Sequence, residues 1–164
     1  MGLSVAEYAN QQDSELMVLI KTSKWTEVRN LLQTPAGKAM TTQKDTYDNL
    51  PLHFSLGYRG PDDIILSILS LNPNATRVHG TDYWLPLHIA AMWGSSTQVM
   101  EELILCFPEA LEDVGEPGIK GRTPRHFAGR FEHNRVLLER SIEEWNKIIE
   151  ERKGSKTLTS SGMA

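Results

Sequence analysis

The feature that most constrains the fold is a short motif that recurs along the chain. The stretch NLPLHFSLG at residues 49–57 returns as WLPLHIAAMWG at 84–94 and, more loosely, as RTPRHFAGRF at 122–131. The prolines of the three copies, and their histidines, are 35 and 38 residues apart. Another three prolines, in QTPAG, LNPNA and CFPEA, are spaced by 38 and 35 residues. A period of this length is typical of proteins built from stacked repeats.

Each repeated unit has the pattern of two short helices. The motif proline suits the first turn of a helix, because no hydrogen bond is lost there when the backbone N–H is missing. A second segment follows, and in the third unit Val99, Leu103 and Cys106 fall on one helical face. The next proline ends that helix. The loops TTQKDTYDN, ATRVHGTDY and EDVGEPGIKGR between the units are predicted to form tight, hairpin-like turns.

The best copy of the motif, LPLHIAAMWG, resembles the signature of ankyrin repeats, T-P-L-H-x-A-A followed by glycine, with Leu85 in place of the threonine. The Pro-x-Ala ends of the units replace the usual Gly-Ala and resemble algal ankyrin proteins. Gly121 alone keeps the family's hairpin glycine, whereas Asp48 and Tyr83 hold the equivalent places in the earlier units. Tyrosine adopts left-handed backbone angles poorly. We therefore expect the loop before Trp84 to depart from the standard hairpin.

The resemblance implies an all-α fold, a solenoid of about four helix-turn-helix units with short loops and a long C-terminal helix. The predicted boundaries are an N-terminal segment at 1–12, an ankyrin-repeat domain at 13–153 with units at about 13–45, 46–80, 81–118 and 119–153, and a disordered tail at 154–164. The stretch NRVLLERSIEEWNKIIEERKG is predicted to be one long helix. Its part around Trp145 either folds back over the last unit or docks a partner helix.

The histidines suggest a metal or catalytic site at first sight. His53, His88 and His126 occupy the same place in successive units, where the resemblance implies a hydrogen bond to the neighbouring turn. Stacked helices lie about 8–10 Å apart, so equivalent imidazoles in adjacent units cannot share one metal ion with bonds of about 2 Å. His79 and His133 have no other ligands at metal spacing and are predicted to be solvated. We therefore expect structural histidines and no metal site.

Composition and motifs also argue against several classes of function. A net charge of −4 lacks the basic excess of nucleic-acid-binding proteins. The apolar run at 64–71 is far shorter than the roughly 20 residues that span a bilayer, and no signal peptide is recognised. No phosphate loop or catalytic motif occurs, and Cys106 is expected to be a buried, inert thiol. We expect a non-enzymatic intracellular protein, cytoplasmic or nuclear, that has no cofactor and is monomeric on its own.

The resemblance implies that a partner protein binds the concave face, which loop tips and the ends of the first helices form. The matching positions are rich in residue types enriched at interfaces. They are Tyr47, Asn49, Tyr58, Thr81, Asp82, Trp84, Met92, Trp93, Ile119, Lys120, Arg122, Arg130 and Phe131. For Trp84 a packing role between imperfect repeats is an equal alternative. The chain is accordingly interpreted as an adaptor or scaffold; the main alternative is a structural subunit docked through the C-terminal helix, and an enzyme or metal-binding protein is less favoured.

Charge differs sharply between neighbouring segments. From Asp82 to Glu116 the chain has seven acidic residues and no lysine or arginine, whereas 120–140 has six basic residues against two acidic ones. The two segments either neutralise each other within the stack or form a bipolar patch that orients a partner.

Overall fold

The structure is a computed structural model that describes residues 13–115 and 121–161. Within these ranges every regular element is helical and no strand occurs. The all-α class predicted from the repeated motif is therefore confirmed for the described residues.

Three short helices open the described chain: α1 (Glu15–Lys21), α2 (Trp25–Leu32) and α3 (Pro35–Met40). The Ser14 hydroxyl accepts a hydrogen bond from the backbone N–H of Met17 at the start of α1. In the same way, the Thr34 hydroxyl accepts one from Gly37 at the start of α3. These caps satisfy N–H groups that the first turn of a helix leaves without partners.

The next two groups of elements are copies of each other. The first contains α4 (Pro51–Gly57), α5 (Asp62–Leu71) and the 3-10 helix η2 (Pro73–Arg77), and the second contains α6 (Pro86–Trp93), α7 (Thr97–Cys106) and η4 (Pro108–Glu112). Each element of the second group begins 35 residues after its counterpart. Proline stands in the first turn of α4, η2, α6 and η4, as the repeated prolines predict.

The C-terminal part contains η5 (Pro124–Phe127), α8 (Glu132–Glu139) and α9 (Ile142–Ser161), and a short turn, η3 (Thr81–Tyr83), lies in the loop before α6. The third copy of the motif thus forms only a 3-10 turn where the first two form α-helices.

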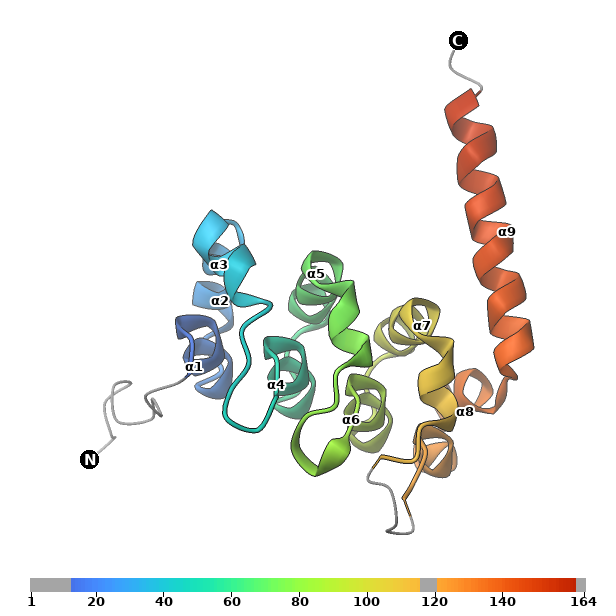
Figure 1. The fold of residues 1–164 in the computed structure, drawn as a ribbon, viewed down its shortest axis with the longest axis horizontal. Helices are drawn as coiled ribbons and strands as arrows, with labels where there is room; N and C mark the ends of the chain where they lie inside the picture. The colour runs from blue at the N-terminus through green and yellow to red at the C-terminus, as the bar shows by residue number, and fades with distance from the viewer. Residues whose placement is uncertain (1–12, 116–120, 162–164) are drawn as a thin grey trace.

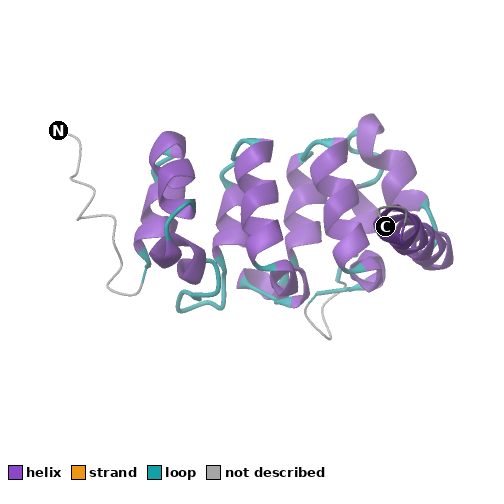
Figure 2. Ribbon diagram, turned by 90° about the horizontal axis from the view of Figure 1, so that it is seen from above, coloured by secondary structure: helices purple, strands orange, loops and turns teal. Residues whose placement is uncertain are grey.

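The helices stand in one row with two layers (Figures 1 and 2). In one layer α1 contacts α4, α4 contacts α6, and α6 contacts η5; in the other α2 contacts α5, α5 contacts α7, and α7 contacts α8. The loops before α4 and α6 lie along the same edge of the row (Figure 1).

One continuous apolar core runs between the two layers. Leu52 and Leu56 of α4 and Ile68 of α5 are buried, and Leu87 of α6 and Leu103 of α7 extend the core into the next group. Removal of this apolar surface from water is the main stabilising contribution to such a fold. Because every group shares its core with its neighbours, the row positions the loops relative to one another.

The C-terminal segment corrects the prediction of one long helix. Helix α8 ends at Glu139, and Arg140 is extended with ψ of 141°. The backbone N–H of Ser141 donates to the Glu144 carboxylate over 2.9 Å, and the Glu144 N–H donates to the Ser141 hydroxyl over 3.2 Å. This reciprocal pair is a capping box, which begins a new helix. The sequence SIEE therefore starts α9 instead of continuing α8.

Trp145 holds the beginning of α9 against the row. Its side chain is fully buried, and its indole N–H donates to the carbonyl of Leu137 over 3.2 Å. The Arg140 guanidinium lies 4.7 Å from the centre of the ring. Because α9 also contacts α7 and η4, the part around Trp145 folds back on the stack, which is one of the two alternatives left open by the sequence.

The far part of α9 points away from the row (Figure 1). The helix continues to Ser161, so it extends into the segment at 154–164 that was predicted to be disordered. With 20 residues α9 has the length needed to cross a bilayer, but its sequence is rich in glutamate, lysine and arginine. Within the described ranges, no helix combines the length and the apolar character that a membrane span requires.

Candidate binding surface

Two loops of similar construction precede α4 and α6. In the first, the backbone N–H of Asp45 donates to the carbonyl of Asn49 over 3.0 Å. In the second, the N–H of Gly80 donates to the carbonyl of Trp84 over 2.9 Å. We call these segments the first loop (45–49) and the second loop (80–84). The same closing hydrogen bond, 35 residues later, gives both loops the same span.

The second loop is the more strained of the two. In the first loop only Asp48 is left-handed, with φ of 63°, whereas the second contains two consecutive left-handed residues, Asp82 at 57° and Tyr83 at 56°. Left-handed angles cost roughly 1–2 kcal/mol for most residues. The loop before Trp84 therefore differs from its counterpart at the place where tyrosine replaces a tolerant residue.

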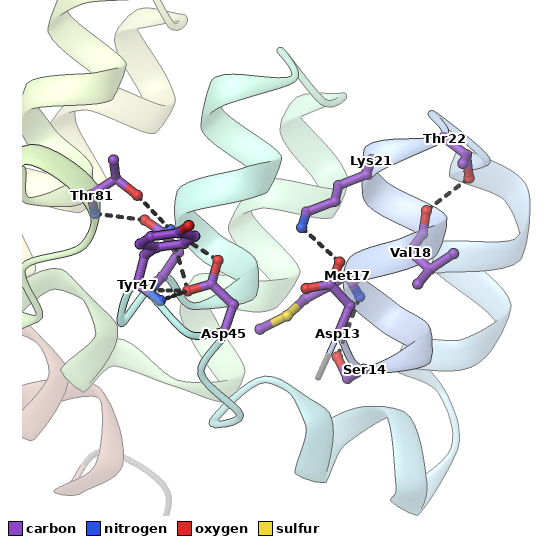
Figure 3. Close-up of polar contacts among 10 residues, drawn as sticks. Asp13, Ser14, Met17, Val18, Lys21, Thr22, Asp45, Tyr47 and Thr81 are labelled. Carbon is purple, nitrogen blue, oxygen red and sulfur yellow. Dashed lines mark hydrogen bonds and ion pairs between the residues drawn. The ribbon is translucent and has the colours of Figure 1, made fainter. Parts of the chain in front are cut away.

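Asn49 joins the two loops to each other by bonding Asp45 of the first and Thr81 of the second, two residues that Figure 3 labels. Its side-chain amide donates to the Asp45 carboxylate over 3.0 Å and to the Thr81 hydroxyl over 2.8 Å, and its carbonyl accepts the N–H of Thr81 over 2.9 Å. A Cβ on Gly80 would lie 2.3 Å from that carbonyl oxygen, so only glycine permits this approach. Asn49 is 7% exposed. Its placement corrects our expectation of a contact residue: the side chain is occupied in fixing the loops.

The first two motif histidines join the start of their own helix to the residue that directly follows the next 3-10 helix of the same unit. The Nδ1 atoms of His53 and His88 accept the backbone N–H groups of Leu50 and Leu85, both over 3.1 Å. Since Nδ1 is the acceptor, Nε2 carries the proton, and it donates over 2.9 Å to a carbonyl 25 residues further on. Burial lowers the pKa of His53 to about 4 and also lowers the pKa of His88. Both rings are therefore neutral structural groups at pH 7.

The third motif histidine makes only the local half of this arrangement. The Nδ1 atom of His126 accepts the N–H of Thr123 over 3.0 Å, and the side chain is exposed. Within the residues that the structure describes, no hydrogen bond of its Nε2 atom is found.

His79 and His133 are not simply solvated, contrary to our expectation. His79 lies 3.0 Å from the Asp113 carboxylate, and His133 lies 3.2 Å from the carbonyl of Ser95. Both contacts join neighbouring units. In the described part of the chain, no group of three or more histidine, cysteine or acidic side chains could hold a metal ion.

Cys106 is half-buried at the end of α7. Burial, followed by the nearby charge of Glu102, raises the pKa of its thiol. A raised pKa disfavours the thiolate, which is the nucleophilic form.

Four exposed aromatic rings lie on or beside the loops and helix ends. Tyr47 is 67% exposed, Tyr58 47% and Trp93 44%, as suits contact residues. Tyr83 is 53% exposed but was not among the predicted site residues. The sequence did contain a signal for it. Tyr83 stands where a turn glycine is expected, so the loop, and not the core, determines where its ring lies.

Trp84 and Met92 are half-buried and pack against the core. The Trp84 ring stacks on His88 with 5.9 Å between the ring centres and meets Phe127 edge-on at 6.0 Å. Trp84 therefore has the packing role, while part of its surface also lines a pocket.

A pocket of about 230 Å³ opens between α4, α6 and the second loop. We call it the inner pocket. Among its lining residues are five of the predicted contact positions, namely Asn49, Thr81, Asp82, Trp84 and Trp93. The structure thus brings these residues together, although Asn49 is held inside by its hydrogen bonds.

A wider groove of about 750 Å³ lies between the first and second loops. Tyr47 and Tyr83 line it together with Lys44, Arg77 and Asp82. It is adjacent to the inner pocket because Thr81 and Asp82 line both.

The predicted contacts of the last unit differ in their exposure. Arg122 and Arg130 are exposed, whereas Ile119 and Lys120 lie outside the described residues. Phe131 is half-buried. Its ring packs so closely on Gly94 that a Cβ added to Gly94 would lie 2.6 Å from it. Phe131 therefore packs between units and is less available to a partner than expected.

Ion pairs join the acidic third unit to the basic residues that follow it. Arg125 lies 2.7 Å from Glu112, and Arg152 lies 2.8 Å from Glu101 and 3.6 Å from Glu102. Of these, the Arg125–Glu112 pair joins the two segments at 82–116 and 120–140, whereas Arg152 lies beyond the second of them.

Comparison with known proteins adds no family. A scan against protein-family models and a search of curated proteins both find no match to this chain.

Proposed function

We propose that the chain is an ankyrin-type solenoid of about four units. The support is the 35-residue offset between every element of the two interior groups, together with the identical histidine bonds in each. The motif LPLHIAA in the sequence supports the same assignment to an ankyrin-type solenoid.

We further propose that it is a non-enzymatic adaptor that binds another protein along the two loops and the inner pocket. The observation that carries this proposal is the meeting of separately predicted residues in one pocket, beside exposed Tyr47, Tyr83 and Trp93. Aromatic side chains are enriched at binding hot spots. The Asn49 bonds fix the loops before a partner arrives, so little conformational entropy is lost on binding.

The remaining parts of this proposal concern the class of partner, the oligomeric state, the compartment and the need for a cofactor. A chain with net charge −4 suits a protein partner better than nucleic acid. We propose a monomer that works in the cytoplasm or nucleus and needs no cofactor.

Affinity capture with two matched double variants tests the binding surface. Tyr47→Ala with Trp93→Ala removes two exposed rings from the surface, whereas Leu71→Ala with Val136→Ala removes two exposed apolar side chains that do not line the inner pocket. Mass spectrometry should recover a partner with the wild type and the second variant but not with the first. Cooperative urea unfolding of both variants would show that they remain folded. Equal recovery with all three proteins contradicts the proposal.

The alternative is docking through α9, whose far part points away from the row (Figure 1). Its Trp145 is buried against the row, so this apolar anchor is not available to a partner. Truncation after residue 153 decides between the two: the adaptor proposal expects the captured partner to be retained, and its loss with the repeats still folded favours docking through α9.

A further inference from the structure

The inner pocket has one charged group in its wall. Its polar lining residues are Asn49, His53, Thr81 and Asp82. His53 is neutral at pH 7 because burial lowers its pKa to about 4, and the Asn49 amide is occupied by Asp45 and Thr81. Asp82 is exposed, and no ion pair or hydrogen bond of its carboxylate is found among the residues described. Asp82 is therefore the one charged side chain among the lining residues. The ammonium of Lys21 lies 4.2 Å from the ring of the lining residue Phe54, but it is paired with Asp13.

Gly57, the last residue of α4, is one of the residues that line the pocket. A Cβ added to Gly57 would meet no atom within 4 Å. The position is thus open because no side chain occupies it, and the rings of Trp84 and Trp93 and the side chain of Ile89 line the same space.

Helix α1, the neighbour of α4 in the same layer, ends on a cation. Lys21 ends α1 as Gly57 ends α4. The Lys21 ammonium lies 4.2 Å from the centre of the Phe54 ring. It also lies 2.7 Å from the Asp13 carboxylate, the contact drawn in Figure 3. An ammonium group between an aromatic face and a carboxylate is a favourable arrangement. The inner pocket has aromatic rings and a carboxylate, but Gly57 supplies no cation.

We propose that the inner pocket receives one lysine or arginine side chain of the partner protein, with Asp82 as counter-ion and Trp84 and Trp93 as aromatic walls. This inference rests on the proposed function, since it names the group through which the partner is recognised. The pocket volume of about 230 Å³ suits one side chain and not a larger element. Arginine would add stacking of its planar guanidinium on an indole ring.

Titration of the full chain, labelled with ¹⁵N, tests the inference by NMR. The probes are Nα-acetyl-arginine amide, Nα-acetyl-lysine amide and the neutral Nα-acetyl-citrulline amide. The two cationic probes should shift the indole signals of Trp84 and Trp93 and leave those of Trp25 and Trp145 in place, since Trp145 is buried. Citrulline should bind more weakly.

Three variants identify the groups responsible. Asp82→Asn should weaken the cationic probes about two- to fivefold, and Gly57→Leu should abolish their binding by filling the pocket. Asp62→Asn is the matched control: it removes the same charge from an exposed side chain in the first turn of α5, outside both loops, and Asp62 does not line the inner pocket. In Asp82→Asn the new asparagine tolerates the left-handed φ of 57°. The control should bind like the wild type.

Several outcomes overturn the inference: no shift of the Trp84 and Trp93 signals, equal binding of citrulline, or unchanged affinity in Asp82→Asn. One of these outcomes can occur while the captured partner is still lost with Tyr47→Ala and Trp93→Ala. In that case the proposed binding function is retained, and the proposal that a lysine or arginine enters the inner pocket is rejected. If the probes bind as expected but capture does not depend on those rings, the pocket stands and the proposed binding surface falls.

Discussion

The interior copies of the motif and its last copy use the same histidine differently. In all three, the ring Nδ1 accepts the backbone N–H at the start of the motif, over 3.1, 3.1 and 3.0 Å. Only His53 and His88 also reach a carbonyl 25 residues further on, directly after η2 and η4. The last copy forms a 3-10 turn, and His126 is exposed.

This difference between the copies separates the hydrogen bond that the motif forms by itself from the hydrogen bond that needs a later loop. Four residues are enough for the Nδ1 bond, so it appears wherever the motif appears. The Nε2 bond needs a following loop, and after the last copy the chain continues into α8 and α9 instead. We infer that α9, packed through Trp145, partly replaces the missing neighbour, and the predictions below test this division.

The largest effect is expected from Trp145→Ala. Because the side chain is fully buried, its removal should lower the free energy of unfolding by about 4 kcal/mol, through lost apolar burial and the cavity left behind. Urea unfolding followed by circular dichroism measures this loss. A change below about 1 kcal/mol would mean that α9 does not stabilise the end of the row.

The next largest effect is expected from pH, and it belongs to the interior copies. The pKa of His53 is lowered to about 4 in the folded chain, against about 6.5 in an unfolded chain. Between these values the unfolded chain binds the proton more readily, so stability is full above pH 6.5 and falls as the pH drops towards 4. The loss from this one group is at most about 3 kcal/mol.

Unfolding measured at pH 7 and at pH 5 checks the pH dependence. The wild type should lose more stability between these values than His53→Ala, which lacks the titrating ring. Val136→Ala, a change of an exposed side chain on α8, controls for mutation as such. Identical losses in all three proteins would show that His53 does not titrate with a lowered pKa.

A smaller effect separates the copies directly. His88→Ala removes the partners of the Leu85 N–H and the Asp113 carbonyl, which should cost about 2 kcal/mol. His126→Ala removes one partner at a site where the Thr123 hydroxyl can still cap the turn, so about 0.5 kcal/mol is expected. Urea denaturation of both variants gives the comparison. Equal losses would mean that the bond from His88 Nε2 to the carbonyl of Asp113 contributes nothing measurable.

The sequence predicted those features that depend on local or periodic patterns. The all-α class and the helix starts at Pro51 and Pro86 follow from the motif and its spacing, and so do the structural histidines. The break before α9 was also readable, since the Ser141 to Glu144 capping box is a local signal. The one-helix prediction followed instead from the helical spacing of the apolar residues Leu138, Ile142, Trp145 and Ile149.

Features that depend on distant residues were not predictable from one sequence. Asn49 has the character of a surface residue until Thr81, 32 residues away, receives its hydrogen bonds. Phe131 likewise resembles a contact residue, yet it packs on Gly94 of the preceding unit. In both cases the deciding partner lies in another repeat, and its approach is set by the stacking of units.

The smallest effect is expected from Arg152→Gln, which removes the ion pairs between α9 and α7. Arg152 lies 2.8 Å from Glu101 and 3.6 Å from Glu102, but all three side chains are partly exposed, so the loss should be about 0.5 kcal/mol or less. It should vanish in about 1 M salt, where the screening length is only about 3 Å. Unfolding at low and high salt measures this difference. A loss comparable to that of Trp145→Ala would show that surface charge, and not the buried indole, joins α9 to the last repeats, and that the row ends by electrostatic attachment instead of by continuation of its core.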